Sequence, residues 1–173
     1  MSIIERGFLD KLSSEACHDS RKRKNFNLHK SYSEACQRLF NAIEPESYIR
    51  PHRHLSDPKN ELLIAVRGLM ALIIFRDDGA LAEVLQIGSD KYGNDVAVGA
   101  EVSPHAWHTV VALEPGSVLL EVKAGPFDVN RPKDLAAWAP EEGSDNVDKY
   151  LQKLLRNIAE WEKCPAPHMV FNR

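Results

Sequence analysis

Between residues 37 and 124 the chain is a series of short runs of β-forming residues, and each run ends at a turn signal. The breaks include Glu44-Pro45, Asp57-Pro58, Asp77-Asp78-Gly79 and Glu114-Pro115-Gly116. Closely spaced strands with no helices between them predict an all-β sandwich, jelly roll or closed barrel. The predicted strands are Gln37–Ile43, Tyr48–His54, Glu61–Arg67, Leu69–Arg76, Ala82–Ile87, Asp95–Val102, Trp107–Leu113 and Ser117–Lys123.

The segments that flank this β region have other patterns. Residues 2–16 predict a short helix, because Ser2 and Glu5 have capping-box spacing and apolar residues recur on one face. Residues 25–29 alternate polar and apolar side chains, as in a half-buried strand. Residues 145–162 predict an amphipathic helix that packs outside the barrel or at a dimer contact. We therefore expect one domain, with a helix and basic linker over 1–24, the barrel over 25–126, and an irregular crossing segment and helix over 127–173.

Composition restricts the classes of partner. The 173 residues suffice for a substantial core, and the net charge of −3 makes nucleic acid an unfavourable partner. The one basic run, residues 21–24, is interpreted as a solvated loop. Three widely spaced cysteines fit a reducing compartment better than a disulfide framework. With no signal-peptide pattern at the N-terminus and no long apolar run, we expect a cytoplasmic protein that does not bind membranes.

Histidines give the strongest chemical signal. His52 and His54 are separated by one residue in a predicted strand, so their side chains point to the same face. Glu61 opens the next strand, and a rolled-up sheet would bring the late strand that carries His108 beside the early ones. Three imidazoles and a carboxylate suit one divalent transition-metal ion and leave positions open for water or substrate. This donor set does not distinguish zinc, iron, manganese and nickel.

Strand alternation also predicts residues that contact a small-molecule ligand. If residues 48–54 are extended, Tyr48 and Arg50 share the face of the histidines. Arg50 could then bind a carboxylate or phosphate through two donors. The alternative is a surface arginine that pairs with an acidic side chain. Asn27 and His29 lie on one face of the early strand. They could cover the barrel mouth as substrate contacts, or they could serve turn and edge-strand structure.

The last strand of the series has two possible orientations. Val118, Leu120 and Val122 share one face, and Glu121 and Lys123 share the other with Leu119. A charged pair inside a barrel is costly unless it is paired or used. We expect the valine and leucine face to be the core and the charged pair to be solvated, with an inward acid/base pair as the alternative.

The spacing of these residues resembles the two sequence motifs of the cupin superfamily. The first motif matches residues 52–68, from His-x-His through Glu61 to Gly68, and the second matches residues 99–108, ending at His108. Six residues separate His54 from Glu61, more than is usual, and we expect this extra turn to bulge outward without displacing Glu61. Over residues 25–143 the chain resembles the WbuC-type cupin-fold metalloproteins, on the segments NFNLH, QRLFNA, SYIRPHRH, WHTVVAL, EVKAGP and WAPEEG.

This resemblance implies a double-stranded β-helix, or jelly-roll barrel, with a bound metal ion. Members of the family are often encoded among genes for surface-polysaccharide (O-antigen) synthesis, which implies a link to sugars or nucleotide-sugars. We expect a metal-dependent enzyme that acts on a small polar molecule, as an isomerase, epimerase or dioxygenase. We also expect the chain to form homodimers. The alternative is a non-catalytic module that binds or senses a small ligand, because one barrel supports many activities.

Overall fold

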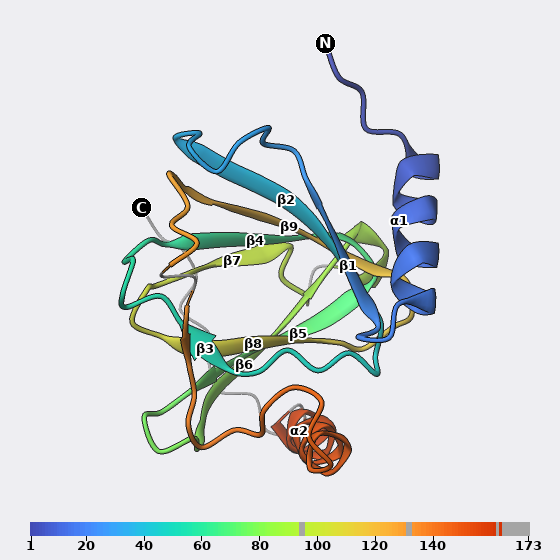
Figure 1. The fold of residues 1–173 in the computed structure, drawn as a ribbon. Coiled ribbons are helices and arrows are strands. Elements are labelled where there is room, and N and C mark those ends of the chain that lie inside the picture. The colour runs from blue at the N-terminus through green and yellow to red at the C-terminus, as the bar shows by residue number, and fades with distance from the viewer. Residues whose placement is uncertain (94–95, 131–132, 162, 164–173) are drawn as a thin grey trace.

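The structure, a computed structural model, describes residues 1–93, 96–130, 133–161 and 163. Within these residues the chain forms two five-stranded antiparallel sheets, flanked by two α-helices (Figure 1). The first sheet has the strand order β1-β2-β9-β4-β7, and the second has the order β10-β3-β8-β5-β6. The elements are α1 (Arg6–His18), β1 (Arg23–Asn27), β2 (Cys36–Ile43), β3 (His52–Arg53), β4 (Glu61–Arg67), β5 (Leu69–Phe75), β6 (Leu81–Gly88), the 3₁₀ turn η1 (Asp90–Tyr92), β7 (Gly99–Val102), β8 (Trp107–Ala112), β9 (Ser117–Ala124), β10 (Asp134–Leu135) and α2 (Val147–Trp161).

The two sheets face each other and enclose the main core (Figure 1). Early and late strands are neighbours in both sheets, since β2 pairs with β9 and β3 pairs with β8. This arrangement is a jelly roll, and it confirms the predicted fold class. The core between the sheets consists of Ile43, Leu63, Ala65, Met70, Leu72, Ile87, Val102, Val110, Ala112 and Leu119.

Each helix covers the outer face of one sheet. Helix α1 buries Leu9, Leu12 and Ala16 in a cluster with residues of β2 and β9. Helix α2 buries Leu151, Leu154 and Ile158 against β5, β6 and β8, as its apolar stripe predicts. The predicted start of the first helix is wrong, because α1 begins at Arg6 and residue 5 is its N-cap. The predicted last residue of the second helix, 162, lies outside the described residues.

Most strand ends fall within two residues of the predicted turns. The largest error is Tyr48–His54, where only His52 and Arg53 form a strand. Strand β7 begins at Gly99, and residue 95, where this strand was predicted to begin, lies outside the described residues. Strand β10 was not predicted at all. The basic run at residues 21–24 is not simply a solvated loop, because Arg23 and Lys24 belong to β1.

Gly68 joins β4 to β5 in a turn that requires glycine. Its φ angle is +75°, in the left-handed region that other residues avoid. A Cβ atom at this position would lie 2.2 Å from Ser117 Oγ and 2.8 Å from Ser117 Cα. The motif glycine therefore allows β9 to pass close to this turn.

The described cysteines and helices can be compared with the sequence expectations. Cys17 and Cys36 are exposed and free of disulfides, and Cys164 lies outside the described residues. In the part of the chain that the structure describes, no helix combines the length and the apolar character needed to cross a membrane.

Candidate metal centre

The four predicted metal ligands come together between the two sheets. His52 on β3 is the direct cross-strand partner of His108 on β8, and cross-strand partners project their side chains to the same face. His54 follows β3, where its backbone N–H donates to the carbonyl of Pro104. Glu61 opens β4 in the opposite sheet. One sheet and the residue that directly follows its strand β3 thus supply three imidazoles, and the other sheet supplies the carboxylate.

The ligand atoms of this cluster converge closely. The ring centroids of His52 and His108 are 4.5 Å apart, and those of His54 lie 5.3 Å from His52 and 5.9 Å from His108. One nitrogen from each histidine and one oxygen of Glu61 all lie within 4.8 Å of one another. His54, Glu61 and His108 are buried, and His52 is half-buried.

Backbone contacts orient the rings for coordination. The Nδ1 atom of His52 lies 3.0 Å from the carbonyl oxygen of Arg50, and that of His108 lies 3.0 Å from the carbonyl oxygen of Ala106. A carbonyl only accepts, so each Nδ1 carries the proton and each Nε2 keeps a lone pair. This is the second contact that metal-bound histidines usually make.

Glu61 lies against two of these imidazoles. Its Oε1 atom is 3.1 Å from Nε2 of His54, and its Oε2 atom is 3.2 Å from Nε2 of His108. This His54 nitrogen is buried, and despite the short distance it has no hydrogen-bond partner of suitable geometry among the described residues. Metal–ligand bonds of about 2.0–2.2 Å place neighbouring ligand atoms about 3.0–3.5 Å apart. The spacing of these ligand atoms therefore fits a divalent metal ion bound between them.

The electrostatics of the cluster favour the forms that bind metal. Burial lowers the pKa of His52 well below its usual value, and Lys133 and His108 lower it further, so the ring is neutral near pH 7. Burial alone would raise the pKa of Glu61. Contacts with His108 and His54 and the charge of Lys123 outweigh that effect and keep it well below the usual value. A neutral imidazole and an ionised carboxylate are the coordinating forms.

Glu61 is also held by a chain of charged groups. Lys123 Nζ lies 2.8 Å from Glu61 Oε1 and 2.8 Å from Glu121 Oε1, and Asn41 Nδ2 donates to Glu121 Oε2 over 3.0 Å. The expectation that Glu121 and Lys123 face solvent is wrong. The opposite face of β9 is apolar because it packs against α1, where Val118 is fully buried. Both faces of this strand are covered, so the charged pair points into the barrel.

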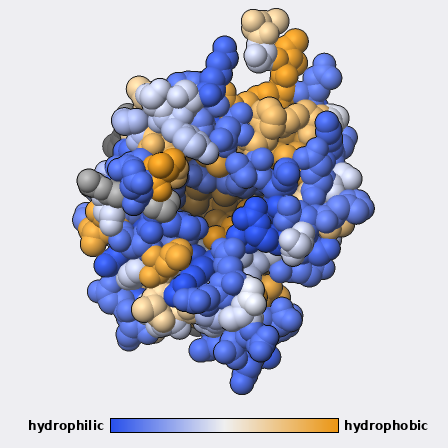
Figure 2. Space-filling model, viewed as in Figure 1, coloured by the Kyte–Doolittle hydropathy of each residue, from blue (hydrophilic) through white to orange (hydrophobic). Residues whose placement is uncertain are grey.

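A cavity of about 280 Å³ adjoins the histidines. Its lining combines the polar cluster with the apolar side chains of Ile43, Ile49, Leu63, Val110 and Leu119. Figure 2 shows the molecule hollowed in this view, with hydrophobic surface inside and hydrophilic residues around the opening. The volume is close to the roughly 300 Å³ at the lower end of small-molecule sites.

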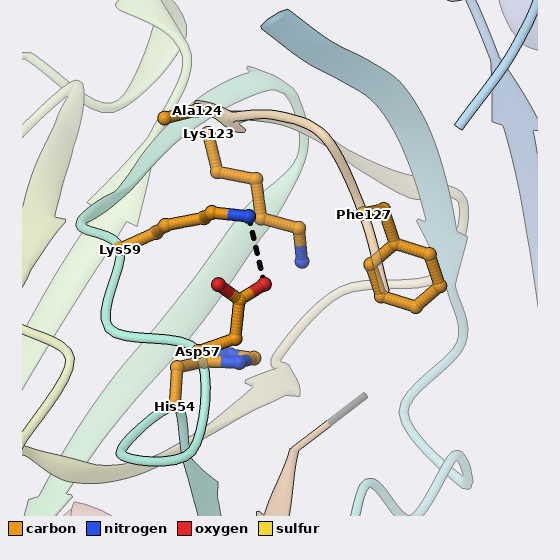
Figure 3. A pocket seen from close by; sticks show the side chains of 6 residues that line it. All are labelled: His54, Asp57, Lys59, Lys123, Ala124 and Phe127. Carbon is orange, nitrogen blue, oxygen red and sulfur yellow. Dashed lines mark hydrogen bonds and ion pairs between the residues drawn. The ribbon is translucent and has the colours of Figure 1, made fainter. Parts of the chain in front are cut away.

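The long segment between His54 and Glu61 lies beside the site but does not line the main cavity. Lys59 Nζ donates to Asp57 Oδ2 over 2.7 Å and also to the carbonyl of Pro126. Figure 3 shows this pair beside His54 and Lys123, where these residues line a second, much smaller recess. Ser56 donates through its backbone N–H and its hydroxyl to Asp134 next to β3. Hydrogen bonds thus fix the inserted residues both next to β10 and next to Pro126. Glu61 remains in the metal cluster, as expected.

Tyr48 and Arg50 lie away from the cavity. Residues 48–51 do not form a strand, so the alternation that placed both side chains beside the histidines is wrong. Tyr48 is buried, donates to the carbonyl of Pro140 and packs edge-on against Tyr150 of α2. Arg50 donates from Nε and Nη2 to the carbonyl of Ala136. Contact with a substrate stays a prediction for both residues, and the geometry gives it no support.

Asn27 and His29 are likewise absent from the cavity lining. The Asn27 side chain accepts from Asn25, which is a local contact within β1. His29 is buried, and its Nδ1 accepts from the backbone N–H of Arg38. These contacts fit the structural alternative for this segment, and a role in ligand binding stays a prediction.

Two cationic side chains that line the cavity were not predicted from the sequence. Arg23 comes from the basic run, and its guanidinium donates to the carbonyl of Tyr48 and to Glu142. Lys133 lies in the irregular segment that precedes β10. No periodic pattern marks either residue, because Arg23 lies at the start of a short strand and Lys133 lies outside any strand.

Comparison with solved structures shows the fold of the chain. Protein SO0799 from Shewanella oneidensis superposes with a TM-score of 0.52 at 11% identity, over 83% of this chain and 87% of that one. This likeness agrees with the jelly-roll barrel that the two sheets form. A cupin 2 domain-containing protein from Halorhodospira halophila matches at 14% identity and a TM-score of 0.46, covering 85% of each chain. KdgF from Halomonas sp. matches at 13% identity and a TM-score of 0.47, over 62% of this chain and 83% of that one.

Sequence comparisons add a partial family match. Residues 4–87 match a family model described as a domain of unknown function (DUF6016). This stretch includes three of the four clustered residues and ends before the strand that carries His108. No curated protein sequence matches the chain.

Proposed function

We propose that this cupin barrel is a metal-dependent enzyme that acts on a small polar molecule. The convergence of three imidazoles and the Glu61 carboxylate at the edge of a 280 Å³ cavity carries the proposal. His52, His54, Glu61 and His108 would hold one divalent ion. When bound, such an ion supplies Lewis-acid or redox chemistry, and the donor set accepts zinc, iron, manganese or nickel.

Beside this ion, Glu121 would donate or accept a proton, and Lys123 would hold it in position. Burial and the neighbouring Glu61 carboxylate raise the pKa of Glu121, so this side chain can hold a proton nearer neutral pH than an ordinary glutamate. Lys123 bridges Glu121 and Glu61, so it fixes both carboxylates in orientation. A cavity carboxyl group with a raised pKa suits an isomerase or epimerase, which must move a proton. A dioxygenase stays a further candidate, because the histidine and carboxylate donors also suit iron.

We further propose that the chain is a WbuC-type cupin whose substrate is a sugar or nucleotide-sugar of surface-polysaccharide synthesis. The six sequence segments given above support this proposal. Homodimerisation and a cytoplasmic location are proposals of the same kind. Leu62 and Val66 on the outer side of β4 are each 38% exposed, and they offer an apolar surface to a second copy. Sedimentation of the purified protein measures the oligomeric state.

Elemental analysis followed by turnover assays tests the proposed function. Purified protein should carry close to one divalent ion per chain. A screen of sugars and nucleotide-sugars with metal-loaded protein should then find a substrate that is consumed, and removal of the metal should stop the reaction. Metal-free protein that binds no added divalent ion would overturn the metal site. Tight ligand binding without turnover would replace the enzyme by a binding module.

A further inference from the structure

Three cations and two carboxylates line the cavity beside the histidine cluster. The cations are Arg23, Lys123 and Lys133, and the carboxylates are Glu61 and Glu121. Glu142, which is not in the lining, pairs with Arg23, so these charges balance before any metal ion binds. A divalent ion would make the cavity positive, so the metal-loaded cavity favours an anionic occupant.

Two of these cations have protein partners. Lys123 is shared between Glu61 and Glu121, at 2.8 Å from each. Arg23 donates to the carbonyl of Tyr48 and to the Glu142 carboxylate. Both groups are fixed by these contacts, which satisfy their charge and orient their donors.

Lys133 differs from the other two cations. In the described part of the chain, its ammonium makes no hydrogen bond and no ion pair. An ammonium carries three donors, and a partly buried cation is costly when it is left unpaired. Burial lowers the pKa of Lys133, and Arg23 acts in the same direction while Glu142 opposes both. The missing partner of this amine would be an anion supplied from outside the protein.

The position of Lys133 relates it to the candidate metal centre. It directly precedes β10, whose residue Leu135 is the cross-strand partner of His52. Lys133 also acts electrostatically on the His52 imidazole, and both residues line the same cavity. A ligand bound in this cavity could therefore contact the amine and the metal ion at once.

We propose that Lys133 is the anion-binding residue of the cavity and that the ligand is a small molecule bearing a carboxylate or phosphate group. This inference rests on the proposed function for the metal ion beside it. It moves the anion contact from Arg50, which does not line the cavity and donates from Nε and Nη2 to Ala136, to Lys133, which does line it. The polar end of the ligand would bind between Lys133 and the metal, and the rest would lie on the apolar lining.

Anion titration of metal-loaded protein tests the role of Lys133. Inorganic phosphate and acetate serve as the two probes, and calorimetry gives their dissociation constants. Lys133→Met should weaken the preferred anion at least about tenfold, the effect expected for loss of one charged hydrogen bond. Lys133→Arg should retain most of the affinity. Lys153→Met removes the same charge from an exposed position on α2 and should change nothing. The probe that binds tighter identifies the acid group.

Metal content, measured on each variant, separates this inference from the proposed function. Equal anion affinity in wild type and Lys133→Met would overturn the inference, as would failure of the wild type to bind either anion. If the wild type binds no metal, the proposed function fails, and the same comparison in metal-free protein still decides the role of Lys133. Lys133→Gln replaces Lys133→Met if the latter does not fold, which circular dichroism would reveal.

Discussion

His52 and His108 lie directly opposite each other on paired strands, and their ring centroids are 4.5 Å apart. The two residues come from distant parts of the sequence, so only the closed jelly roll brings them together. Each ring donates through Nδ1 to a nearby backbone carbonyl, which directs both Nε2 atoms toward one point. The backbone of the barrel therefore prepares the site before any ion binds.

Replacing two imidazoles should abolish metal binding. In His52→Ala/His54→Ala only His108 and Glu61 remain of the converging donors, too few to retain a divalent ion against dialysis. Elemental analysis should find close to one ion per chain in the wild type and none in the double variant. The matched control is His18→Ala/His105→Ala, which removes two exposed histidines and should keep the ion. Full metal retention in the first variant would place the ion elsewhere.

Glu61→Gln should lower metal affinity more than tenfold. The amide keeps the shape of the side chain but loses the negative charge that faces His54, His108 and Lys123. Competition with a chromogenic chelator measures the dissociation constant. Glu160→Gln, at an exposed position on α2, provides the control for a lost carboxylate. An unchanged affinity in Glu61→Gln would remove this residue from the coordinating set.

Removing the metal should destabilise the fold. Without the metal ion, the His54 nitrogen and the Glu61 carboxylate lie 3.1 Å apart in a buried site with no metal ion to link them. A ligand at one hundred times its dissociation constant stabilises the native state by about 2.7 kcal/mol. For a chain of this size, that corresponds to roughly 5–10 °C in Tm. Calorimetric scans with and without chelator measure the shift, and a Tm that is independent of metal concentration would argue against a native-state site.

Gly68→Ala should destabilise the barrel by about 1–3 kcal/mol. Glycine has a φ of +75° here, and a Cβ atom would collide with Ser117, whose backbone cannot move without shifting β9. Urea unfolding measures the loss. Gly143→Ala is the control, because it has a similar φ of +81° but no atom near the new Cβ, so the difference between the two variants isolates the steric effect.

The strands could be predicted because turn residues mark their ends locally. Pro58, Gly79 and Gly116 stop extended runs whatever the rest of the chain does, and β4, β5 and β9 accordingly lie where they were expected. The His-x-His spacing likewise predicts a shared face over a distance of two residues. Turn residues and side-chain spacing act over a few residues, so predictions based on them do not depend on the strand order in the sheets.

The orientation of β9 could not be predicted, because it depends on what covers each face. Leu119 packs in the barrel core and Val118 packs under α1, so apolar residues occur on both faces of the strand. The alternation of side chains along β9 therefore does not show which face of the strand points into the barrel. Only the pairing of Glu61 with Lys123 across β4 and β9 shows that the charged side chains face the metal ligands. The position of Lys133 in the cavity lining could not be predicted for a related reason, since it depends on the pairing of β10 with β3.

Arg50→Lys should lower stability and leave the metal site intact. The Arg50 guanidinium donates twice to the carbonyl of Ala136, at 3.1 and 2.8 Å, and its side chain is only 13% exposed. Lysine cannot reproduce this fork, so the free energy of unfolding should fall by about 1–2 kcal/mol. Urea unfolding measures this loss, and Arg21→Lys at an exposed position should change stability by less than about 0.5 kcal/mol. Metal content and phosphate affinity should match the wild type, because neither the ligands nor Lys133 are touched. Weakened phosphate binding at unchanged stability would instead return the anion contact to Arg50.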